Sequence, residues 1–238
     1  LASFVSQRGS AGNVGWDLNY TATGTKINFI ISNDGTSLVT ASSTFTPVNG
    51  RSYHIAGVKN GNTLTVYVDG IAGATTGDFT GLTAYNSTEK LCIGGITPSG
   101  TPAQLLKGHV SQVRISDSAR YTGSFTPSQT AFSSDANTLF LAKGDEANGA
   151  TTFTDSSTTG ATITTAGNVK IWYWEDLRSC IILDSETTPK YFYPVGATKV
   201  DFVSAFGTGA MYTDGSDDHL LFGDDADWDA GTADFTWE

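Results

Sequence analysis

The sequence predicts an all-β fold in which antiparallel strands form a sandwich or barrel. Glycine is abundant, at 27 of 238 residues, and only 16% of the residues are charged, a composition that favours strands and turns over helices. Short runs of apolar or alternating residues recur with centres about 8 to 12 residues apart, a spacing typical of all-β sandwiches and barrels. No segment has sustained helical periodicity.

The predicted strands follow one another along most of the chain. Each one either alternates apolar and polar residues or runs apolar, and clusters of Gly, Asn, Asp and Ser separate them. They comprise residues 4–7, 15–20, 26–32, 38–42, 54–59, 64–69, 91–94, 109–116 and 138–143.

Residues 51–70, RSYHIAGVKNGNTLTVYVDG, form the clearest predicted hairpin. Asn60-Gly61 supplies two residues that readily adopt positive φ, as a tight hairpin turn requires. After this turn, alternate residues are expected to point toward one face of the strand, namely Leu64, Val66 and Val68. Asp69-Gly70 then ends the strand with a second turn signal.

The charge of the chain argues against nucleic acid as a partner. The formal net charge is −11, so the summed field repels phosphate backbones. No apolar run approaches the roughly 18 residues of a membrane-spanning helix, and no basic segment followed by an apolar one marks a signal peptide. We therefore expect no membrane insertion. Because the chain begins at Leu1 within a predicted strand, we also expect that it does not start where its gene starts.

Two cysteines, Cys92 and Cys180, lie in separate strand-like apolar runs. A disulfide between them is one interpretation. We favour two separate buried thiols, because free cysteine commonly packs in proteins as a small hydrophobic residue.

Two segments resemble a known family. Residues 53–70, YHIAGVKNGNTLTVYVDG, resemble the central hairpin of the laminin-G-like, concanavalin A-like lectin/glucanase jelly-roll family. Residues 108–128, GHVSQVRISDSARYTGSFTPS, resemble its closing segment, with an arginine-bearing strand, an Ala-Arg-Tyr turn and a Phe-Thr-Pro exit. Together with the following DANTLFLAKGDEANGATTFTDSS, this segment is most similar to laminin-G-like repeats of bacteriophage tail and appendage proteins. The resemblance covers residues 1 to about 168 and implies an antiparallel jelly-roll β-sandwich.

The C-terminal residues resemble the beginning of the same family domain. Three parts are therefore predicted: a laminin-G-like sandwich lacking its first strands (1–168), an aromatic-rich β connector or small subdomain (169–203), and the N-terminal strands of a laminin-G-like domain (204–238). Tandem repeats, a circular permutation, or pieces joined with residues missing between them would each give this split or partial second copy, and we favour tandem repeats. All three interpretations predict that residues 219–222 pair with a strand like residues 138–143, in the same copy or in a neighbouring one.

The predicted connector is dense in aromatic residues, namely Trp172, Tyr173, Trp174, Tyr191, Phe192 and Tyr193. One interpretation is a short β-meander whose alternate faces pack on a neighbour, and we favour it. The other is an interaction surface, because Tyr and Trp supply large rigid contact area to proteins or sugars.

No constellation of residues indicates catalysis. A glycoside hydrolase on this fold needs two carboxylates about 5 to 9 Å apart. Glu175 and Asp176 are adjacent in sequence and would lie on opposite faces of a strand, and Asp145-Glu146 has the same defect in a turn-like segment. The histidines, which are too scattered for a metal cluster, are His54, His109 and His219. Nothing points to a Ser-His-Asp triad, so we expect no catalytic residue and no enzyme.

Calcium is the one cofactor that the sequence leaves open. The acidic residues that would supply oxygen ligands are Asp214, Asp217, Asp218, Asp224, Asp225, Asp227 and Asp229. Alternating acids at 225, 227 and 229 are typical of ligands for a hard cation, but Ala230 stands where the glycine of such a loop is expected. We favour an acidic turn capping a short helical kink at residues 226–228.

These observations favour a non-enzymatic, lectin-like surface module. The resemblance implies a place on a phage appendage or virion, or another extracellular surface, with adhesion to a glycan or another host surface group. The alternative is a purely structural virion protein, a fibre or decoration component that pairs with other copies or virion proteins, because incomplete sheets need a partner. A glycoside hydrolase is the third and least favoured function.

Overall fold

The computed structural model describes residues 1–48, 51–173, 180–182, 190–192, 209–214, 219–222 and 235–237. These residues are organised almost entirely as antiparallel strands, so the predicted all-β class is confirmed. The described residues include no α-helix, and a single 3-10 turn occupies Pro98–Gly100.

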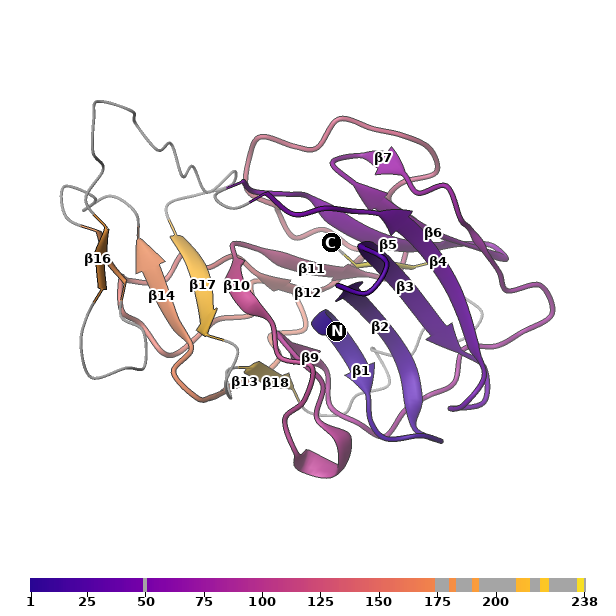
Figure 1. Cartoon of the computed structure of the whole chain (residues 1–238), viewed down its shortest axis with the longest axis horizontal. Coiled ribbons are helices and arrows are strands. Elements are labelled where there is room, and N and C mark those ends of the chain that lie inside the picture. Colours follow the sequence, from indigo (N-terminus) through magenta and orange to yellow (C-terminus); the bar gives the residue numbers. More distant parts are fainter. Residues whose placement is uncertain are drawn as a thin grey trace.

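One seven-stranded sheet has the order β13-β18-β9-β1-β2-β3-β4. Its strands are β1 (Ala2–Arg8), β2 (Val14–Thr21), β3 (Lys26–Ser32), β4 (Leu38–Thr44), β9 (Cys92–Ile93), β13 (Ile163–Ala166) and β18 (His219–Phe222). We refer to it as the N-terminal sheet, because its four longest strands are the first four of the chain. Figure 1 shows β1 to β4 in indigo and purple.

The second seven-stranded sheet has the order β12-β11-β19-β5-β6-β7, and β8 also pairs with β6. Its strands are β5 (Ile55–Asn60), β6 (Thr63–Val68), β7 (Ile71–Ala72), β8 (Gly77–Asp78), β11 (Val113–Ser116), β12 (Thr138–Ala142) and β19 (Phe235–Trp237). We refer to it as the hairpin sheet, after the β5–β6 hairpin.

Two smaller sheets complete the described strands and lie on the left of Figure 1. The three-stranded sheet is formed by β10 (Lys107–Val110), β17 (Gly209–Asp214) and β14 (Lys170–Tyr173), with β17 in the middle. The two-stranded sheet pairs β15 (Cys180–Ile182) with β16 (Lys190–Phe192).

The hydrophobic core lies between the N-terminal sheet and the hairpin sheet. Alternate residues of the strands point inward, and the fully buried ones include Trp16, Phe29, Ile31, Leu64, Ile115 and Phe140. Gly57 on β5 allows the two sheets to approach closely, because a Cβ at this position would lie 2.5 Å from the ring of Phe29. The core residues, which range from Val5 to Ile171 in the sequence, come together where the two sheets face each other.

The β5–β6 hairpin is confirmed, but its turn lies one residue later than predicted. Asn60 is the last residue of β5 and pairs with Thr63, so the two-residue turn is Gly61-Asn62. Only Gly61 in this turn has positive φ, at 57°, as expected for a hairpin turn with glycine at its first central position. The sequence gives both Asn-Gly and Gly-Asn at this place, so turn signals alone leave the register open.

Most predicted strands are present with ends shifted by one or two residues. The exception is the predicted strand at residues 109–116, which is two strands in different sheets, β10 and β11. Ser111 and Gln112 separate them, and Gln112 accepts a hydrogen bond from the Phe132 amide at 2.8 Å. This polar break directs the chain from one sheet to the other.

The predicted pairing of residues 219–222 is wrong. This strand, β18, pairs with β9 on one side and β13 on the other, both in the N-terminal sheet. The predicted partner β12 pairs instead with β11 in the hairpin sheet. Periodicity identifies strands but not their neighbours, and so it assigned β18 to the wrong layer.

Two strands of the predicted aromatic connector also lie in sheets. Trp172 and Tyr173 belong to β14, which pairs with β17, and Tyr191 and Phe192 belong to β16. Trp174 and Tyr193 lie outside the described residues.

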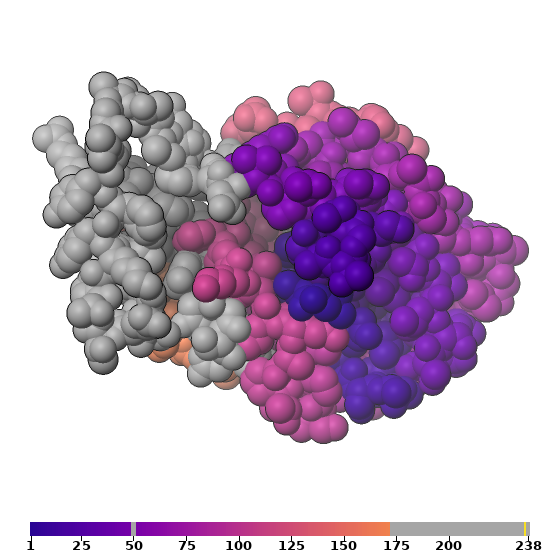
Figure 2. Space-filling view, in the orientation of Figure 1, coloured from indigo at the N-terminus to yellow at the C-terminus, as the bar shows by residue number. Residues whose placement is uncertain are grey.

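In the space-filling view of Figure 2, the N-terminal residues in indigo lie near the centre of the visible face, next to residues of the middle of the chain in pink.

Candidate functional site

A polar face covers the outer side of the N-terminal sheet. While Val5, Trp16 and Leu18 point into the core, the alternate residues of β1 to β4 point away from it. Strand pairing aligns these outward residues into two rows, Ser3–Asn19–Asn28–Ser42 and Ser6–Asp17–Ile30–Thr40. Seven of these eight side chains carry hydroxyl, amide or carboxylate groups. Six of the eight are buried, and only Asn28 and Thr40 reach solvent.

Asp17 is the charged centre of the polar face. Its carboxylate is fully buried and accepts hydrogen bonds from Ser3 at 2.6 Å and from Asn19 at 2.9 Å. The Arg8 guanidinium donates at 2.9 Å to Oδ2, the oxygen that also accepts from Asn19, whereas Ser3 donates to Oδ1. The Arg8 side chain is 18% exposed. Burial raises the pKa of Asp17, and its hydrogen bonds and Arg8 only partly oppose that effect. Three hydrogen-bond donors hold the carboxylate in one orientation, and Arg8 supplies the opposite charge.

Asn28 extends this network toward solvent. Its amide nitrogen donates to Asn19 at 3.1 Å and to Thr21 at 3.0 Å, and the side chain is half-buried. Beside it on β3, Lys26 is exposed and pairs with Thr44 of β4. The face thus combines oriented amides and hydroxyls with a rigid support, which is the chemistry that recognises hydroxyl-rich ligands.

Aromatic side chains do not form a platform on the described polar face. Trp16 is buried in the core, and Tyr20 packs edge-on against Phe45 at 6.0 Å between ring centroids. Tyr53 contacts the other side of Phe45 at 4.7 Å, with the Arg51 guanidinium 4.6 Å from the Tyr53 ring centre. These rings close one end of the sandwich rather than the polar face.

A second aromatic group covers the outer face of the hairpin sheet. Residues 117–132 cross this face, and Tyr121 and Phe125 stack on each other at 3.6 Å. Both rings pack on Ala56, Val58 and Tyr67 of the β5–β6 hairpin. The sequence predicted that this side of β6 was only half-buried, but the crossing segment buries Tyr67 to 3% exposure.

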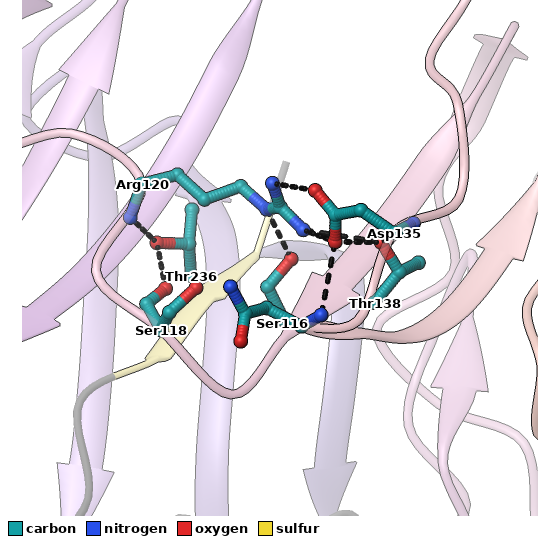
Figure 3. Close-up of polar contacts among 7 residues, drawn as sticks. Ser116, Ser118, Arg120, Asp135, Thr138 and Thr236 are labelled. Carbon is teal, nitrogen blue, oxygen red and sulfur yellow. Dashed lines mark hydrogen bonds and ion pairs between the residues drawn. The ribbon is translucent and has the colours of Figure 1, made fainter.

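A polar clamp lies where the crossing segment meets β11 and β12, and we define it as Ser116, Ser118, Arg120, Asp135 and Thr138 (Figure 3). The Arg120 guanidinium donates to both Asp135 oxygens, at 2.8 and 2.7 Å, and also to Ser116. Thr138 donates to Asp135 at 2.8 Å. Arg120 lowers the pKa of Asp135 well below its usual range, so the pair is charged at neutral pH and fixes the crossing segment.

The clamp binds one residue of β19. The Arg120 amide donates to the Thr236 hydroxyl at 2.8 Å, and that hydroxyl donates to the Ser118 carbonyl at 2.9 Å. Thr236 is fully buried. Figure 3 shows the hydroxyl between these two backbone groups. One donor and one acceptor together select a hydroxyl side chain at this position.

The residues considered for catalysis do not come together in the described structure. Glu146 accepts a hydrogen bond from the Thr154 amide at 2.6 Å, and Asp145 lies 3.6 Å from Lys143, so both organise a loop. Glu175 and Asp176 lie outside the described residues. His54 is buried under the Tyr121 and Phe125 rings, whereas His109 lies on β10 in another sheet and His219 on β18.

The acidic residues predicted as possible calcium ligands lie mostly outside the described part of the chain. Asp214 ends β17, and the other acids of the predicted loops, Asp217, Asp218, Asp224, Asp225, Asp227 and Asp229, lie outside the described residues, as do residues 226–228. Within the described part of the chain, no cluster of three or more His, Cys, Asp or Glu side chains is placed to hold a metal ion.

Cys92 is a free buried thiol, as expected for a cysteine that packs as a hydrophobic residue. Burial raises its pKa far above the ordinary value, and the Asp17 carboxylate adds to this effect. Cys180 lies on β15. A search of the described residues finds no helix long and apolar enough to cross a membrane.

Sequence reasoning missed both polar networks. Asp17 and Asn19 stood in a correctly predicted strand, where their alternation with Trp16 and Leu18 was a signal for a polar outer face. Arg120 was noted only as part of an Ala-Arg-Tyr turn. Its link to Thr236 spans 116 positions, and no local pattern in the sequence carries such a contact.

Comparison with known proteins gives one match. The family model Laminin_G_3, described as the concanavalin A-like lectin/glucanases superfamily, matches residues 2–122. That range is just over half of the chain and includes β1 to β11, the hairpin of residues 53–70 and, of the clamp, Ser116, Ser118 and Arg120. Comparisons with curated proteins and with solved structures gave no match.

Proposed function

Because the chain belongs to the concanavalin A-like lectin/glucanase superfamily, which includes both enzymes and non-enzymatic lectins, we propose that it is a non-enzymatic module that binds glycan through its polar face. The observation that carries this proposal is the pair of outward rows on β1 to β4. Sugar hydroxyls both donate and accept hydrogen bonds, and rigidly held amides, hydroxyls and carboxylates pair with them.

The accessible part of the proposed site lies around Asn28. Arg8, Thr21 and Asn28 are partly exposed, whereas Asp17 and Asn19 lie behind them and hold them by hydrogen bonds. This arrangement places oriented groups in contact with solvent and their supports out of it. With Arg8 paired to Asp17, the ligand class that fits is a neutral, hydroxyl-rich glycan.

The absence of catalysis is part of the proposal. In strands β1 to β4 the only carboxylate is Asp17, and it is buried and paired with Arg8. A glycoside hydrolase needs a second carboxylate about 5 to 9 Å away that faces the same sugar. The polar face therefore supports binding better than hydrolysis.

We also propose a location on a virion surface or in another extracellular setting. The support is the similarity of residues 108–128 to laminin-G-like repeats of bacteriophage tail and appendage proteins. A structural role in a fibre or decoration protein is the second function, which requires that β18 and β19 complete the sheets of other copies rather than those of their own chain. Mass spectrometry of purified virions tests this location, since the chain should be found in the particles.

A glycan array followed by calorimetry tests the binding proposal. We expect the protein to bind neutral glycans on the array. For a glycan so found, Asn28→Ala should raise the Kd about tenfold, which corresponds to about 1.4 kcal/mol. The matched control is Asn62→Ala, an exposed turn residue of the other sheet, which should leave the Kd unchanged. No binding on the array, or equal Kd values for both variants, would contradict the proposal.

A further inference from the structure

Strand β19 lies inside the hairpin sheet, between β11 and β5, and we call this position the slot. It pairs with β11 through Ile115↔Trp237 and Ser116↔Thr236, and with β5 through Thr236↔Val58 and its neighbours. Strand β5 otherwise pairs only with β6, and β11 only with β12. Without β19, these two strands would each present an unpaired edge, and the sheet would be divided in two.

The slot selects both the sequence and the register of the strand that fills it. The clamp surrounds the Thr236 hydroxyl with the Arg120 amide and the Ser118 carbonyl. A shift by one residue would turn this hydroxyl to the opposite face of the sheet and leave both backbone groups without their partner. The slot thus accepts an extended segment with a hydroxyl residue at one defined position.

The segment that supplies β19 contributes to three sheets. Strand β17 lies between β10 and β14, β18 lies between β9 and β13, and β19 lies between β11 and β5. All three of these strands occur after residue 208. Residues 174–208 join β14 to β17, and a connection of this length can reach on the order of tens of ångströms even with the β15–β16 hairpin within it.

From this arrangement we propose that copies of the chain exchange their C-terminal strands, so that β19 of one copy fills the slot of a second copy. The partner is a second copy because every copy carries the strand that its own slot fits. Exchange keeps the same hydrogen bonds and registers in both arrangements, so that only the connection differs. This inference concerns the hairpin sheet and is independent of glycan binding at the polar face.

A disulfide trap in the full chain tests the exchange. One variant carries Lys59→Cys and another carries Phe235→Cys, since these residues lie directly opposite each other and the Thr236 hydroxyl is kept in both. Both also carry Cys180→Ser, whereas Cys92 is retained because its buried thiol is unreactive. The two variants are denatured, mixed, refolded together at high concentration and oxidised.

We expect a disulfide-linked heterodimer on a non-reducing gel. In the control, Ile71→Cys replaces Lys59→Cys; Ile71 is 68% exposed on β7, where β19 does not pair, so the heterodimer should be lost. As a reference, a third variant carries both cysteine substitutions in one chain. If this variant forms its disulfide within a monomer while the mixture of the two single variants stays unlinked, the proposal is overturned. Should neither disulfide form, sedimentation of the unsubstituted chain decides: dimers or larger assemblies after refolding support exchange, and monomers at every concentration refute it.

Discussion

Replacement of Thr236 by valine should destabilise the hairpin sheet strongly for so small a change. Thr236→Val keeps the shape of the side chain but removes the hydroxyl that joins the Arg120 amide to the Ser118 carbonyl. Each buried group left without a partner costs about 1 to 3 kcal/mol, partly offset by the more apolar methyl group. We expect the free energy of unfolding to fall by about 2 kcal/mol.

The assay is urea unfolding followed by tryptophan fluorescence, with Thr236→Ser as the matched control. Serine keeps the hydroxyl and loses one buried methyl group, which costs about 1 kcal/mol. With an m value of about 2 kcal/mol/M, the midpoints should fall by about 1 M for valine and about 0.5 M for serine. If the Thr236→Val variant is as stable as the Thr236→Ser variant, or more stable, the argument that the hydroxyl holds β19 in place is refuted.

Two further predictions concern the crossing segment. Asp135→Asn should cost about 1 kcal/mol or less at pH 7, because Asp135 is 47% exposed and solvent screens its pair with Arg120. Folding lowers the pKa of Asp135 below its ordinary 3.8, so this contribution to stability is present above about pH 4 and is lost as the pH falls further. The unfolding curves of the variant and the parent should therefore converge in acid. A difference in stability that stays constant with pH would contradict this cause. Gly70→Ala should lower the melting temperature far more than Gly61→Ala, because both glycines have positive φ but only a Cβ at Gly70 would meet another atom, the Phe125 carbonyl oxygen at 1.8 Å. Equal shifts would show that backbone strain alone, and not the close approach of residue 125, determines the effect.

Local sequence patterns predicted the strands well and their neighbours poorly. The alternation of Trp16 and Leu18 with Asp17 and Asn19 identified β2 because strand periodicity is a property of a few adjacent residues. The partner of β18 depended instead on which sheet edge was open, a property of the whole fold. For that reason residues 219–222 were assigned to β12, although β9 and β13 hold them.

The candidate site was less predictable than the fold. Sequence reasoning looked for paired acids and aromatic platforms, because those are the local signatures of hydrolysis and sugar stacking. The polar face has neither signature in its described strands. It becomes a site only when pairing aligns Ser3, Asn19 and Asn28, which belong to three different strands. The registers that produce such rows are set by turn geometry and core packing together.

The interior position of β19 also means that the hairpin sheet can be completed only late in protein synthesis. Strand β5 leaves the ribosome about 175 residues before the strand that must lie beside it, which at about 5 to 20 residues per second is a wait of roughly 10 to 35 s. During that interval the nascent chain carries two unpaired strand edges. A polysome holds several such chains close together, each with an open acceptor and a donor still to come. If copies exchange β19 as proposed, closer spacing of ribosomes on the message should increase the share of strands that enter a neighbouring chain's sheet.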